Sequence, residues 1–137
     1  MIVAVHALVG AALGRLSRTR TQAALLGSAS HVAADMLPHR DLEIPQEAAL
    51  LAGALTLIAA TRGVGSREFA GALGAALPDV ENLVGRLRGL PDEMLLLPSH
   101  NRYHGRKTDD FNGQLALALI GIAFLVIPDG QPLLDPS

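Results

Sequence analysis

The sequence predicts an all-α fold: a single domain over residues 1–137, built as a compact bundle of five to six helices with a long irregular loop before the last helix. A length of 137 residues suits one domain. Half of the residues are hydrophobic but only 3% are aromatic, so the apolar side chains are mainly Ala, Leu, Val and Ile. Together with 14 Gly, this composition favours closely packed helices over a β-sandwich.

The first two helices are predicted from an uninterrupted apolar stretch and from a helix cap. Residues 2–16 contain no Pro and form the first predicted helix. Thr19 or Thr21 can cap the start of a second helix, because a threonine oxygen accepts from the backbone N–H groups of the first turn. This helix runs to about Met36 and stops before Pro38, since the residue before a proline avoids the helical conformation.

The third and fourth predicted helices are bounded by Pro and Gly. Pro45 suits the first turn of the third helix, with Glu47 beside it, and Gly63 ends that helix. Ser66 begins the fourth, and we expect Pro78 to end it because proline removes a helical hydrogen bond.

The last part of the chain is predicted to hold a short helix, a loop and an apolar helix. Asp79 can cap a short fifth helix that runs to about Arg88. Residues 89–112 are rich in Pro, Asn and charge, and predict irregular structure. An apolar helix follows over about 112–127. No segment alternates convincingly as a β-strand would.

Charge and cysteine content exclude some functions. The formal net charge of −2 argues against nucleic acid as a partner, since such proteins carry a basic surplus. The chain has no Cys, so it has no disulfide, no thiolate nucleophile and no cysteine-based zinc site. Any metal must be held by His and carboxylates.

A basic cluster and two apolar runs raise the question of a membrane. Arg15, Arg18 and Arg20 follow the first apolar stretch, either as a juxtamembrane anchor or as the solvated end of a helix. The order is wrong for a secretion signal, in which basic residues come first. The longest uncharged runs, 48–60 and 115–128, are shorter than the roughly 20 residues of a spanning helix. Membrane association therefore stays open.

Two histidines and an aspartate are placed as metal ligands often are. His31 and Asp35 are four residues apart in the second predicted helix, so both lie on one face and can bind one cation, or form a surface ion pair. His39 leaves the same helix end. His6 lies in an apolar run, as a core residue bonded to a carbonyl or as a neutral metal ligand.

Asp79 and Glu81 follow Pro78 in the segment GALGAALPDVE. One interpretation is a capping Asp with an acidic first turn. The other is that Asp79 binds a metal, with Glu81 as a general base or as support for a ligand.

The irregular segment is rich in His and basic residues. His100 and His104 are four apart, but Pro and Gly around them favour a loop. Arg102, Arg106 and Lys107 could hold a phosphate there, or could be a solvated loop surface.

Three segments resemble a known family. HALVGAALG (6–14), GSASHVAADMLPH (27–39) and GALGAALPDVE (71–81) are similar to motifs of membrane-bound metal-dependent hydrolases, inner-membrane proteins related in motif style to zinc-dependent phospholipase C. In that family the Ser-His-x-x-x-Asp helix follows the Leu-Pro-Asp motif, whereas here it precedes it. Glu81 replaces an Asp, and residues 100–104 are only a loose counterpart of the family's His-Arg-x-x-Thr-His segment.

The residues and the resemblance together imply a metal-dependent hydrolase of ester or phosphoester bonds. We expect a divalent metal, with zinc the best match to imidazole and carboxylate and with manganese and iron as alternatives. Preformed ligand atoms would lie roughly 3–4 Å apart. Glu81 or His104 would move the proton, and Arg102 and Arg106 would bind a small-molecule or lipid-like anionic substrate. The candidate metal ligands are His6, His31, Asp35, Asp79 and His100.

The alternative is a non-catalytic, small helical membrane-associated protein whose His/Asp pairs are structural. The expected location is the inner membrane or the cytoplasm, not the exterior. The sequence leaves the oligomeric state open.

Overall fold

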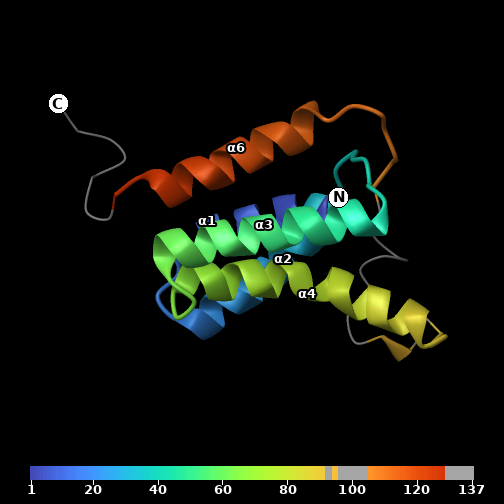
Figure 1. Ribbon diagram of the computed structural model, residues 1–137, viewed down its shortest axis with the longest axis horizontal. Coiled ribbons are helices and arrows are strands. Elements are labelled where there is room, and N and C mark those ends of the chain that lie inside the picture. The colour runs from blue at the N-terminus through green and yellow to red at the C-terminus, as the bar shows by residue number, and fades with distance from the viewer. Residues whose placement is uncertain (92–93, 96–104, 129–137) are drawn as a thin grey trace.

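The computed structural model describes residues 1–91, 94–95 and 105–128 (Figure 1). In this part of the chain the fold is all-helical and forms a compact helical bundle, as predicted from the sequence. Its helices are α1 (Val3–Leu16), α2 (Arg20–Asp35), α3 (Ile44–Arg62), α4 (Arg67–Leu87) and α6 (Asn112–Val126).

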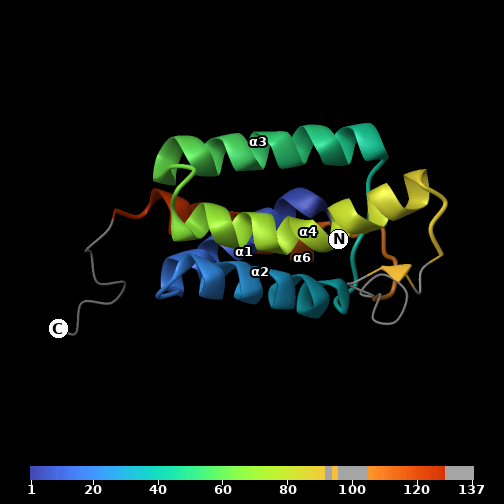
Figure 2. The same cartoon turned by 90° about the horizontal axis from the view of Figure 1, so that it is seen from below.

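Helix α1 is the centre of the bundle and contacts α2, α3, α4 and α6. Seen from below, α2 and α3 lie on opposite sides of α1 and α4 (Figure 2). The core is made of small and aliphatic side chains: Ala7 and Ala11 of α1, Ile58 of α3 and Ala72 of α4 are all fully buried or nearly so. Small side chains let the helix axes approach closely.

Three glycines set the closest approach, where α1, α2 and α4 meet. A Cβ atom added to Gly10 or Gly27 would overlap the carbonyl oxygen of Gly71, and a Cβ on Gly71 would overlap that of Gly10. Gly71 is therefore a packing position. The contact brings the middle of α1 and α2 against the first half of α4, just before Pro78.

Two helix ends have the capping residues that the sequence predicts. Thr19 Oγ1 accepts from Gln22 N at 3.1 Å and caps α2, so the first of the two candidate threonines is used. Gly63 ends α3 with a φ of 87°, a left-handed conformation that glycine adopts at little cost.

The expected break at Pro78 is wrong. Helix α4 continues through Pro78 to Leu87, and the separate short helix predicted from Asp79 is its second half. Pro78 has no N–H for the carbonyl of Gly74, but Ser28 Oγ of α2 donates to that oxygen at 2.9 Å. A neighbouring helix thus supplies the missing hydrogen bond, which lowers the cost of proline inside α4.

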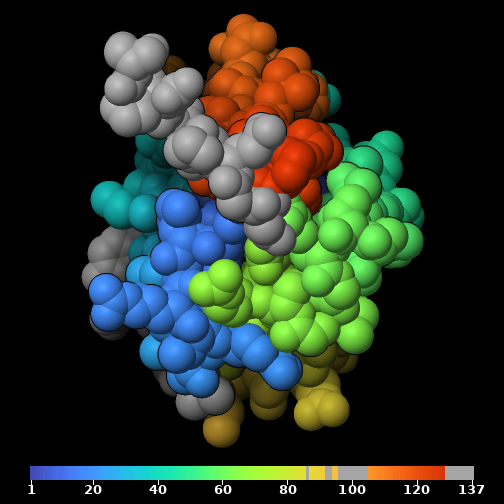
Figure 3. Space-filling model, turned by 90° about the vertical axis from the view of Figure 1, so that its left-hand side faces the viewer, coloured from blue at the N-terminus to red at the C-terminus, as the bar shows by residue number. Residues whose placement is uncertain are grey.

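The arginines of the basic cluster that follows the first apolar stretch lie in two different environments. Arg15 donates to the carbonyl oxygens of Phe124 and Ile127, and Arg62 also donates to Ile127 at 2.7 Å, so both cap the C-terminal end of α6. Arg18 is exposed at the same end of the bundle. Figure 3 shows this end, where α1 turns into α2 and α3 turns into α4.

Helix α3 lies on the outside of the bundle. It is long and apolar enough to cross a membrane, with a mean hydropathy of 1.4 over an 18-residue window of which 6% is buried. Leu50 and Leu57 are 46% and 39% exposed. Among the described residues no other helix meets both criteria, and α6 is apolar but shorter.

Candidate metal centre

His6 and His31 lie against each other at the contact between α1 and α2. Their rings are stacked with centroids 4.0 Å apart and an interplanar angle of 28°. Both side chains are almost completely buried, at 1% and 0% exposure. The glycine contacts described above allow this, because they bring the two helices close enough for the rings to meet.

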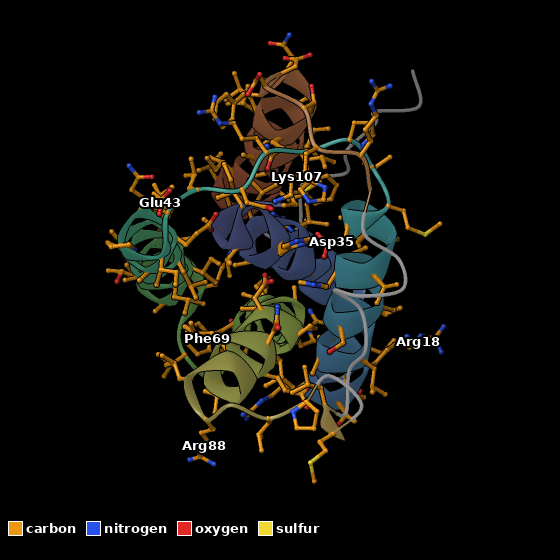
Figure 4. The ribbon with its side chains drawn as sticks, turned by 90° about the vertical axis from the view of Figure 1, so that its right-hand side faces the viewer. Arg18, Asp35, Glu43, Phe69, Arg88 and Lys107 are labelled. Carbon is orange, nitrogen blue, oxygen red and sulfur yellow. The ribbon has the colours of Figure 1, made fainter. Side chains whose placement is uncertain are left out.

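Asp35 holds both histidines from one side. Its Oδ1 accepts from His6 Nε2 at 3.1 Å and from the amino group of Met1 at 2.9 Å. Its Oδ2 lies 3.2 Å from His31 Nε2, the i,i+4 pairing expected from the sequence. Asp35 is fully buried, and Figure 4 shows it between the ribbons of α1 and α2. This carboxylate therefore fixes the position of both rings.

The hydrogen bonds also define the protonation of His6. Burial lowers the pKa of His6 below its usual value of 6.5, more than its contact with Asp35 raises it, so the ring is neutral. When Nε2 donates to Asp35, Nδ1 carries the lone pair. This Nδ1 is buried and has no hydrogen-bond partner among the described residues. A buried acceptor in that state is costly unless a hydrogen-bond donor or a cation reaches it.

His31 is oriented by α4. Its Nδ1 lies 2.9 Å from the carbonyl oxygen of Ala75, which can only accept, so Nδ1 donates. Ala75 is three residues before Pro78, so the second carbonyl near the proline is also bonded by a side chain of α2.

Asp79 of α4 completes a group that could hold a metal ion. His6, His31 and Asp79 each offer one ligand atom, and these atoms all lie within 4.8 Å of one another. The spacing is somewhat wider than the ~3–4 Å expected for a preformed zinc site. Asp79 Oδ2 lies 3.7 Å from His31 Nδ1, and the side chain is 11% exposed. Three helices therefore deliver two imidazoles and a carboxylate to one place.

The remaining candidates that the structure describes, Glu81 and Arg106, do not belong to this group. Glu81 is half-buried two positions after Asp79, which places it about 200° around α4 and on a different face. Arg106 is exposed, and its carbonyl accepts from the backbone N–H of His39 at 3.3 Å. Three candidates lie outside the described residues: His100, Arg102 and His104.

His39 is buried next to the site but is held by other partners. Its Nδ1 bonds to the carbonyl of Leu37 at 2.8 Å, and its Nε2 lies 3.4 Å from Asp41. Asp41 also accepts from the Met1 amino group at 3.2 Å. No sequence pattern indicates that Asp41 or Ser28 lies near the site, since both act through contacts between distant segments.

We call His6, His31 and Asp79 the metal group. A pocket of about 220 Å³ opens beside it, between the start of α1, the first half of α3 and the second half of α4. Asp79 belongs to both the metal group and the pocket lining. The site is thus reached through a mainly apolar opening. The lining residues are Val3, Ile44, Glu47, Ala48, Leu51, Asp79, Val80, Asn82 and Leu83.

Comparison of the chain with protein-family models, with curated proteins and with solved structures found no match.

Proposed function

We propose that this protein is a metal-dependent hydrolase of ester or phosphoester bonds, with the metal held by His6, His31 and Asp79. The observation that carries the proposal is the buried Nδ1 atom of the neutral His6 ring. This atom has no hydrogen-bond partner among the described residues. A core histidine with only a structural role would direct both ring nitrogens at protein groups. Here Nε2 is bonded to Asp35, Nδ1 has no partner among the described residues, and one ring nitrogen of His6 lies within 4.8 Å of ligand atoms of His31 and Asp79.

The donor set fits zinc. Two neutral imidazoles and one carboxylate are typical of catalytic zinc sites, which keep a fourth position for water. When bound, the metal would supply a water of lowered pKa and would polarise the scissile bond. A metal would also counter the negative charge of Asp35 and Asp79, which both lie within 4 Å of the His31 ring at 0% and 11% exposure.

Asp35 acts as a positioning residue in this proposal. By accepting from His6 Nε2, it fixes the tautomer in which Nδ1 is the ligand atom. Its second oxygen lies against His31 Nε2 and restricts rotation of that ring. The proton carriers remain the candidates from the sequence, Glu81 and His104, and Arg106 with Arg102 remains the candidate for binding an anionic group.

Metal content after purification, together with hydrolysis of model substrates, tests the proposal. We expect about one zinc per chain and cleavage of 4-nitrophenyl acetate or bis(4-nitrophenyl) phosphate that a chelator removes. Asp79→Asn should lose the metal and the activity, because it removes the ligand charge. Arg18→Gln is the matched control, since Arg18 is exposed at the other end of the bundle. A folded protein that binds no divalent metal would refute the proposal.

A second candidate, a non-catalytic membrane-associated protein, is favoured by α3. This helix combines a hydropathy of 1.4 with 6% burial, so most of its apolar surface faces outward. Flotation with phospholipid vesicles tests association. Because association and hydrolysis are compatible, only vesicle binding combined with an absence of metal would favour this candidate over the hydrolase.

A further inference from the structure

The pocket beside Asp79 combines apolar walls with a polar end. Leu51 of α3, Leu83 of α4 and Val3 of α1 all line it. The three helices lie side by side in Figure 4. Asp79 lines this pocket and also belongs to the metal group. Such a lining suits a ligand that is apolar along most of its length and polar at one end.

Glu47 lines the pocket, and its carboxylate accepts hydrogen bonds from the backbone. Its Oε2 accepts from Val3 N at 2.8 Å and its Oε1 accepts from Leu42 N at 2.9 Å. The first bond ties the start of α1 to α3, and the second joins α3 to the segment before it. Both carboxylate oxygens of Glu47 are therefore directed at backbone N–H groups.

The mouth of the pocket is apolar as well. Ile44 and Val80 line it and are 62% and 44% exposed. Val80 belongs to a row of exposed apolar side chains on α4, with Leu77 and Val84 one turn away on either side. An apolar chain entering here would meet hydrophobic side chains from the surface to Asp79.

We propose that this pocket binds the apolar chain of an amphipathic ester or phosphoester, whose polar group then reaches Asp79 and the metal ligands. The inference rests on the proposed function for the reaction, but the pocket itself is defined without it. It assigns the substrate class as molecules with an alkyl or acyl chain, and it explains why the metal group opens into hydrophobic surroundings.

Binding of methyl, butyl and octyl phosphate to the full chain, measured by calorimetry with and without zinc, tests the inference. We expect octyl phosphate to bind about tenfold tighter than methyl phosphate or better, because burying roughly two methylene groups has that effect. Ala48→Phe should abolish the difference by filling the pocket. Ala49→Phe is the matched control, because Ala49 is exposed on α3 and does not line the pocket.

The binding measurements either support the assigned substrate class or overturn it. Equal binding of methyl and octyl phosphate, or an unchanged preference in Ala48→Phe, overturns it. If Ala48→Phe does not fold, Val80→Phe narrows the same pocket from an exposed position and replaces it. If zinc does not bind, the hydrolase proposal fails, and the chain-length preference of the zinc-free protein still decides whether the pocket takes an apolar chain.

Discussion

Ser28 of α2 supplies the hydrogen bond that Pro78 removes from α4. The hydroxyl donates at 2.9 Å to the carbonyl of Gly74, the residue whose helical partner would be the N–H of position 78. His31, one turn along α2, bonds the next carbonyl, that of Ala75. The proline therefore leaves one acceptor, the Gly74 carbonyl, that α2 uses, and the neighbouring contact with Ala75 orients a metal-ligand candidate.

We predict that Ser28→Ala destabilises the protein by about 1–2 kcal/mol, since it leaves the Gly74 carbonyl without this donor. Ser30→Ala is the control, because Ser30 donates only within α2, to Gly27 at 2.7 Å. Urea unfolding followed by circular dichroism measures both. In a Pro78→Ala background the backbone N–H returns, so the effect of Ser28→Ala should become smaller. An equal effect in both backgrounds would show that Ser28 does not compensate for the proline.

The glycine contact gives a second prediction. Gly71→Ala should destabilise the protein by roughly 2 kcal/mol or more, because the added Cβ overlaps the Gly10 carbonyl and must push α1 from α4. Gly53→Ala is a suitable comparison within α3, where nothing lies within 4 Å of the new Cβ. There we expect a gain of about 0.5–1 kcal/mol from the better helix propensity of Ala. Thermal melts of the two variants should shift in opposite directions.

The elements that depend on local chemistry were predictable from the sequence. The Thr19 cap and the glycine after α3 involve neighbours in the chain, and the His31–Asp35 spacing follows from helix periodicity alone. The continuation of α4 past Pro78 was not predictable in this way. It involves a hydrogen bond from Ser28 to the Gly74 carbonyl, and these two residues are 46 positions apart along the chain.

The same distinction applies to the candidate site. Residue type singled out His6, His31 and Asp79, and the structure places their ligand atoms within 4.8 Å. The position of Asp35 between two histidines and the Met1 amino group depends on how α1 packs on α2. The role of Arg15 at the end of α6 likewise requires knowledge of which helices are neighbours.

Asp35 allows a test of positioning. Asp35→Asn keeps the shape of the side chain but weakens its hold on His6 Nε2, so we expect zinc affinity to fall by about 10–100-fold. Asp109→Asn is the control, because Asp109 is exposed. Competition with a chromophoric chelator measures the affinity of both. Unchanged affinity in a folded Asp35→Asn protein would mean that Asp35 does not position the metal ligands.

The buried histidines predict how stability depends on pH in the metal-free protein. Burial lowers the pKa of both His6 and His39 below the usual 6.5, so the folded state keeps these rings neutral where the unfolded chain protonates them. The unfolded state then binds more protons, and stability must fall as the pH decreases through about 6.5. This contribution is present above that pH and is lost below it.

Melting temperatures of the metal-free protein between about pH 8 and pH 5 measure this dependence. The groups that face His39 are Asp41, Asp35 and the Met1 amino group, and all remain in His39→Gln. The glutamine amide can still donate to Leu37, but it does not titrate. We therefore expect the melting temperature of His39→Gln to decrease less on acidification than that of the wild type. An equal decrease in the two proteins would assign the acid sensitivity to other groups and contradict the prediction for His39.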